Sequence, residues 1–142
     1  MPLPFPSKAP NPYTTSKQLI SGDDFNNVVA QLNSAEDAIT ATPAGTQETS
    51  YQLKAAVNNV TVVATANDGV RLPKGFVGLE VWIRNSDAAD SLRVFPYPAT
   101  AGAASDTING GANFNIASGP TTATIFKVVS VSAAGAANWI TK

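Results

Sequence analysis

The residues able to do chemistry in this chain are mainly carboxylates, because the 142-residue sequence contains neither histidine nor cysteine. The commonest general base, the commonest metal ligand and the thiolate nucleophile are therefore absent. The acids are Asp23, Asp24, Glu36, Asp37, Glu48, Asp68, Glu80, Asp87, Asp90 and Asp106. Catalysis by carboxylates alone needs two acids held together in a pocket, whereas most of these fall at expected caps, turns or solvent faces. We therefore expect no enzyme activity and assign no catalytic residue.

One predicted loop groups oxygen atoms of the kind that calcium prefers. Asn85, Asp87 and Asp90 lie close together in the sequence. Their spacing does not match an EF-hand, so we interpret them as a hydrated turn rather than a metal site. The sequence has no Gly-rich phosphate loop and no nucleophile elbow. We expect neither a metal nor a cofactor.

Aromatic residues offer a different binding chemistry, which is stacking on a sugar ring. Trp82, Tyr97 and Trp139 could form such a platform. Aromatic side chains are more often buried or placed at protein interfaces. The sugar platform is therefore kept as an alternative to protein contact.

The composition favours contact with protein over contact with nucleic acid or lipid. Charged residues make up 13% of the chain, against about 25% in an average soluble protein, and the formal net charge is -1. This balance argues against a nucleic-acid partner. No apolar run is long enough to span a membrane, so we expect no membrane partner. Low charge reduces the free-energy cost of desolvating a surface, which favours burial against protein.

Residues 1–20 are predicted to form an extended arm. Five of the ten prolines fall within the first 13 residues, and proline fixes φ and removes a hydrogen-bond donor. Such a segment has no internal hydrogen bonds, yet its apolar side chains favour burial. We expect it to lie along a neighbouring subunit, with a disordered tail as the alternative. The contact residues would be Leu3, Pro4, Phe5, Pro6, Pro10, Pro12 and Tyr13.

An amphipathic helix followed by a linker is predicted for residues 21–45. Ser21 and Asp24 resemble a capping box, and apolar residues then recur at spacings of three and four. The apolar face consists of Phe25, Val28, Val29, Leu32 and Ile39. This face could pack on the chain's own domain or form a short bundle around a symmetry axis, and the sequence leaves both open.

From residue 46 to residue 142 the pattern predicts a jelly-roll-like antiparallel β-sandwich. The apolar period drops to two, and turn signals recur at intervals typical of sandwiches and barrels. Strands are expected near residues 49–57, 60–65, 69–72, 77–84, 91–97, 112–117, 122–131 and 136–141.

Two of these strands predict an aromatic patch. On residues 79–84, Leu79, Val81 and Ile83 alternate with Trp82 and its polar neighbours. If this strand pairs with the next one through the loop at residues 85–90, the outer face carries Trp82, Phe95 and Tyr97 together. A monomer seldom exposes a contiguous aromatic patch, so we expect these three residues at an interface.

Several short segments resemble a β-module of tailed-bacteriophage structural proteins. They are residues 70–73 (VRLP), 78–85 (GLEVWIRN), 91–96 (SLRVFP) and 106–110 (DTING), followed by Trp139. The resemblance covers about residues 57–141 and is nearest to the head-decoration (cement or head-fibre) class. It implies an oligomeric virion component, often trimeric, seated on the capsid lattice.

This resemblance sets the functional expectation. We expect a structural protein, made in the host cytoplasm, that decorates the outer surface of the phage capsid. It would bind the major capsid protein through the arm and stabilise the assembled head as a homotrimer. The arm and the helix lie outside the resemblance, so their roles are inferred. The alternatives are a tail-fibre or receptor/glycan-binding β-module and a small lyase or hydrolase that uses carboxylates alone.

Overall fold

The computed structural model describes residues 35–99, 104–119 and 123–142, and every regular element in these ranges is a β-strand. The strands are β1 (Ala35–Thr40), β2 (Tyr51–Gln52), β3 (Val57–Val62), β4 (Gly69–Arg71), β5 (Glu80–Asn85), β6 (Leu92–Phe95), β7 (Thr107–Ile108), β8 (Phe114–Ile116), β9 (Thr124–Val131) and β10 (Ala137–Thr141). The prediction of a mainly β, sandwich-like fold is therefore confirmed.

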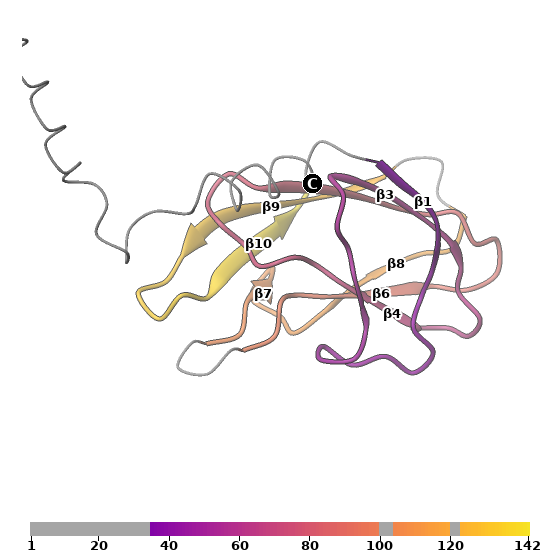
Figure 1. Ribbon diagram of the computed structural model, residues 1–142, viewed down its shortest axis with the longest axis horizontal. Helices are drawn as coiled ribbons and strands as arrows, with labels where there is room; N and C mark the ends of the chain where they lie inside the picture. The colour runs from indigo at the N-terminus through magenta and orange to yellow at the C-terminus, as the bar shows by residue number, and fades with distance from the viewer. Residues whose placement is uncertain (1–34, 100–103, 120–122) are drawn as a thin grey trace, which may run out of the picture. The chain divides into compact units, whose positions relative to one another are not determined.

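Two sheets lie face to face (Figure 1). The six-stranded sheet has the order β1-β3-β5-β9-β10-β7, and the four-stranded sheet has the order β2-β4-β6-β8. Side chains of both sheets meet in one hydrophobic core, in which Trp139 and Phe126 are the largest fully buried residues. The rings of Phe114 in β8 and Phe126 in β9 meet edge to face between the sheets, with centroids 5.7 Å apart.

From β1 to β6 the chain winds as a flattened coil that places successive strands alternately in the two sheets. Each return to a sheet therefore lays a strand parallel to the previous one, as β1, β3 and β5 do in one layer and β2, β4 and β6 do in the other. Parallel neighbours need a long crossover, and here the crossover passes through the opposite sheet. The C-terminal β9 and β10 instead form an antiparallel hairpin.

The expectation of an antiparallel sandwich is wrong for most strand neighbours. Five of the eight pairings in the described ranges are parallel: β1–β3, β3–β5, β2–β4, β4–β6 and β7–β10. The reason is that alternation of apolar residues specifies which face is buried, and not which strand lies alongside. A loop between two strands could equally close a hairpin or cross to the other layer.

The predicted helix is also wrong over its last part. Residues 35–40 form β1, which pairs with β3 and places Ile39 in the core with 4% of its surface exposed. The spacing of Ala35 and Ile39 fits a helix, but the segment pairs with β3 and buries Ile39, and tertiary packing of this kind outweighs a local helical pattern. Pairing continues beyond the strand, where the Ala41 N–H donates to the Val62 carbonyl. Residues 21–34 of the predicted helix lie outside the described residues.

Among the residues that the structure describes, no helix is long and apolar enough to cross a membrane.

Candidate interaction surface

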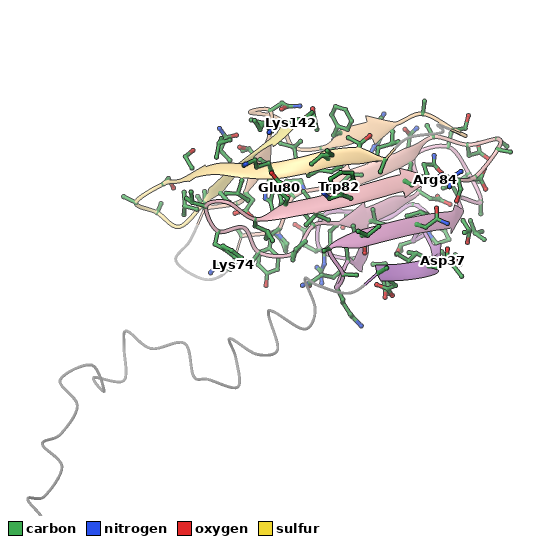
Figure 2. The ribbon with its side chains drawn as sticks, turned by 90° about the horizontal axis from the view of Figure 1, so that it is seen from above. Asp37, Lys74, Glu80, Trp82, Arg84 and Lys142 are labelled. Atoms are coloured by element: carbon green, nitrogen blue, oxygen red, sulfur yellow. The ribbon has the colours of Figure 1, made fainter. Side chains whose placement is uncertain are left out.

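The outer face of the six-stranded sheet carries the exposed aromatic residue that the sequence pointed to. Along β5, Val81 and Ile83 are buried, while Glu80, Trp82 and Arg84 point away from the core. Figure 2 looks down on this face and shows these three side chains in line along the strand. Trp82 keeps 42% of its surface exposed although it lies in the middle of a six-stranded sheet.

Trp82 belongs to an apolar row that crosses three strands. Its register partners are Val57 in β3 and Ile125 in β9, so these side chains lie beside it on the same face. Val57 is 48% exposed, and Ile125 is half-buried. We refer to Val57, Trp82 and Ile125 as the apolar row. An exposed apolar row of this kind in the centre of a sheet is typical of a contact surface.

An ion pair borders the apolar row on one side. Lys127 Nζ lies 3.0 Å from Glu80 Oε1, and these two residues are register partners in β9 and β5. The hydrogen bond and the charge of Lys127 hold the pKa of Glu80 below its usual value, with a smaller contribution from Lys142. Both side chains are partly exposed, so the pair contributes little to stability.

A second group of opposite charges borders the row on the other side. Asp37 Oδ1 accepts hydrogen bonds from Asn59 Nδ2 at 2.8 Å and from the Ala38 N–H at 2.7 Å. These bonds, together with the nearby charge of Arg84, hold the pKa of Asp37 below its usual value. Asn59 is in turn the register partner of Arg84. The outer face thus has both acidic and basic side chains on each side of the apolar row.

Further apolar side chains are exposed near one end of the same sheet. Phe76 and Val77 lie in the loop between β4 and β5, and Val129 and Val131 lie in β9. The loop is joined to β9 because the Gly78 N–H donates to the Val128 carbonyl. These residues extend the exposed apolar surface along β9 and beyond the apolar row.

The structure separates the three predicted interface aromatics. Trp82 is exposed on the six-stranded sheet, but Phe95 ends β6 in the other sheet and is only 9% exposed. Tyr97 is partly exposed in the loop that follows β6. The expectation of one shared patch is therefore wrong, because β5 and β6 do not pair. The buried side-chain amide of Asn85, at the end of β5, donates to the Asp90 and Ala117 carbonyls and so joins β5 to the segments before β6 and after β8.

The sugar platform is contradicted in the same way. Trp139 is fully buried, and its indole N–H donates to Asp106 Oδ2 at 3.3 Å. A buried ring cannot stack on a ligand from solvent. Of the three platform residues, Trp82 is the one on an exposed sheet face, with Tyr97 in a loop of the opposite layer.

Three acids from the described ranges organise loops. Asp106 accepts hydrogen bonds from the Gly75 and Ala137 N–H groups and from Trp139 Nε1. Asp68 accepts from the Ala44 N–H and from both the N–H and the hydroxyl of Thr65. Asp87 accepts hydrogen bonds from the backbone N–H groups of Val63, Ala89 and Asp90. Their oxygen atoms therefore hold backbone donors in place.

Asp68 shows how these bonds act on a buried carboxyl group. Burial by itself raises the pKa of Asp68, which is 1% exposed. Hydrogen bonds from the Thr65 hydroxyl and from nearby backbone N–H groups outweigh burial and hold the pKa below its usual value. In the calcium alternative, Asn85 and Asp87 would be ligands, yet both are already bonded within their own loop. The described residues contain no group of three or more metal-ligating side chains.

Sequence reasoning missed a polar contact between the edges of the two sheets. The Tyr51 hydroxyl in β2 donates a hydrogen bond to Glu36 Oε1 in β1. This bond, together with burial, raises the pKa of Tyr51 to about 12. The Lys54 ammonium lies 5.7 Å from the centre of the Tyr51 ring. The signal that could have found β1 is the run Ile39, Thr40, which favours a strand over a helix.

The remaining predicted contact residues cannot be compared with the structure. Leu3, Pro4, Phe5, Pro6, Pro10, Pro12 and Tyr13 of the arm lie outside the described residues, as do Phe25, Val28, Val29 and Leu32 of the helix face. Ile39, the last member of that face, lies in the sandwich core.

Comparisons with known proteins add no relative: no protein-family model, curated protein or solved structure matches this chain.

Proposed function

We propose that this chain is a structural virion protein that decorates the outer surface of a phage capsid and reinforces the assembled head. It would be made in the host cytoplasm, bind the major capsid protein and act as a homotrimer. The observation that carries the proposal is the apolar row on the outer face of the six-stranded sheet, in a chain with few charged residues. Such a surface fits burial against protein.

The resemblance to head-decoration proteins supports the same function. The segments that carry it lie in the sandwich, where residues 78–85 supply β5 and the exposed Trp82. Two-layer β-sheet folds are common in viral capsid proteins, so the observed sandwich is compatible with this role. A decoration protein binds the assembled shell but not separated subunits, so it stabilises the shell by mass action.

Removal of the arm tests the proposal. A variant that lacks residues 1–13 should fail to bind purified heads while its sandwich, measured by circular dichroism and thermal unfolding, stays folded. A matched control replaces Leu3, Phe5 and Tyr13 with serine in the full chain and leaves the prolines in place. If both variants bind heads as well as the original chain, the arm is not the capsid contact.

Copy number tests the function independently of the arm. Quantitative mass spectrometry of purified virions should find the chain in many copies relative to tail components. Absence from virions would refute the virion assignment. A handful of copies would instead favour the second candidate.

The second candidate is a tail-fibre or receptor-binding module, and exposed Trp82 is the observation that favours it. A Trp82→Ala substitution would then lower adsorption of virions to cells. Arg93→Ala, on the other sheet, is a control with little expected effect. Unchanged adsorption for the Trp82 variant would remove this candidate.

A further inference from the structure

The outer face of the six-stranded sheet is complementary to itself. On β5, Glu80 and Arg84 lie two residues before and two residues after Trp82, on the same face. The apolar row crosses the strand between them. A half-turn about an axis that runs along the row exchanges the two sides, so that Glu80 of one copy faces Arg84 of the other.

We propose that a second copy of this chain docks on the apolar row through a two-fold axis parallel to that row. The two copies of β5 then run antiparallel across the interface. Val57, Trp82 and Ile125 lie on the axis, and each meets the same residue of the second copy. Glu80 faces Arg84 of the second copy, and Arg84 faces Glu80 of the second copy.

The charges decide between the possible orientations. With the axis along the strands instead, Glu80 would face Glu80 and Arg84 would face Arg84, and like charges across an interface are unfavourable. The mixed signs on the face also disfavour a uniformly charged partner. Both sides of the apolar row carry both signs of charge. Lys127 and Lys142 lie near Glu80 on one side, and Asp37 lies near Arg84 on the other.

The arrangement of polar and apolar groups is that of an interface centre. Tryptophan and arginine are the residues that most often dominate binding energy, and a tryptophan surrounded by polar groups is a frequent arrangement. The Glu80–Lys127 pair and the Asp37–Asn59 hydrogen bond lie around Trp82 and would form the rim. Packing of two such sheets face to face brings the backbones to about 10 Å from each other.

This contact does not depend on the capsid function, because it is measured on the purified chain without heads. A homotrimer that forms through a different face is compatible with it, since the two-fold contact would then join two trimers. Head binding is assigned to the arm at residues 1–13 and this contact to the apolar row, so loss of head binding and loss of this contact are separate results.

Cross-linking tests the contact, because the chain contains no cysteine and a single introduced thiol is unique. Val57→Cys places a thiol on the axis and keeps Trp82. A bis-maleimide with a reach of about 10 Å, which matches the sheet spacing, should give a covalent dimer in high yield. Val131→Cys is the matched control, since Val131 is also an exposed valine of this sheet. It lies six residues along β9 from Ile125, about 20 Å from the axis and about 40 Å from its counterpart, so it should stay monomeric.

Mass measurement gives a second test. Sedimentation should show an even number of chains, and Trp82→Ser should halve the mass while circular dichroism stays unchanged. Arg84→Glu, which puts like charges opposite each other, should weaken association about tenfold, whereas Arg84→Lys should weaken it less. These two variants keep the test valid if the serine variant folds poorly.

Several results would overturn the proposal. Equal cross-linking at residues 57 and 131, or no cross-linking at either, excludes a two-fold axis along the row. A monomer whose introduced thiol at residue 57 reacts freely shows an open face. A monomer whose thiol is protected shows that another part of the same chain covers the row. The proposal is also rejected if neither Trp82→Ser nor Arg84→Glu changes the mass of the assembly in sedimentation.

Discussion

The inner and outer faces of the six-stranded sheet are built from alternate residues of the same strands but differ in what their side chains contact. On β5, Val81 and Ile83 contact the core, while Trp82 between them is exposed. Inner residues are held by packing from both sheets. Outer polar residues are held by an ion pair and by hydrogen bonds along the surface. Substitutions inside should therefore change stability, whereas substitutions outside should change association and leave the fold intact.

The largest effect is expected from loss of the buried carboxyl group of Asp106. Asp106→Ala leaves three N–H donors without an acceptor, from Gly75, Ala137 and Trp139, and should lower the free energy of unfolding by about 4 kcal/mol. Urea denaturation measures the change. Asp37→Ala, which removes an exposed carboxyl group, should lower the free energy of unfolding much less. Equal losses for the two variants would show that burial does not separate these acids.

A matched pair of valines compares the two faces directly. Val81→Ala removes fully buried methyl groups and should destabilise the fold by about 2 kcal/mol. Val57→Ala makes the same change on the exposed face and should cost less than about 0.5 kcal/mol. Thermal unfolding at low protein concentration, which keeps association out of the measurement, should show this difference. A larger loss at Val57 would mean that the outer face is packed in the single chain.

A smaller effect, confined to acid solution, is expected from Asp68. Its pKa is lower in the folded chain than the unfolded value of about 3.9, so the ionised form stabilises the fold above that pH. This contribution is lost as the pH falls through the folded pKa. Asp68→Asn should therefore flatten the decline of stability with falling pH. A variant whose acid unfolding curve runs parallel to that of the original chain would contradict this assignment.

The smallest effect is expected at Ala38, which is exposed in β1 with a φ of 59°. Alanine is strained in this left-handed region, and glycine is not. Ala38→Gly should raise the free energy of unfolding by up to about 1 kcal/mol. Ala133→Gly, at an exposed position without a positive φ, should instead lower it by about 0.5 kcal/mol. A loss at both positions would show that strain at Ala38 is negligible.

Much of the sandwich could be predicted because burial alternates along a strand. The alternation at residues 79–84 predicted the buried side chains of Val81 and Ile83 and the exposure of Trp82. The recurring turn signals also agree with the structure, since Asn109 and Gly110, residue types that favour turns, both adopt a positive φ between β7 and β8. The short strand β7 was missed, since two residues are too few for a periodic pattern.

The interaction surface was only half predicted. Trp82 was expected at an interface, but its neighbours Val57 and Ile125 were not, because they come from strands far away in the sequence. Phe95 was expected beside it and lies buried in the other sheet. A loop of a few polar residues after β5 does not reveal whether the next strand returns alongside or crosses between layers.

The sequence by itself determined the strand-rich body, the scarcity of charge and the direction in which each β5 side chain points. These are local properties, set by residue type and by the two-residue period of an extended backbone. Only the tertiary structure decided that β1 is a strand, that the chain coils between two sheets and that the apolar row gathers around Trp82. Those outcomes depend on hydrogen bonds between distant segments, whose free energy is shared among all the strands that pack together.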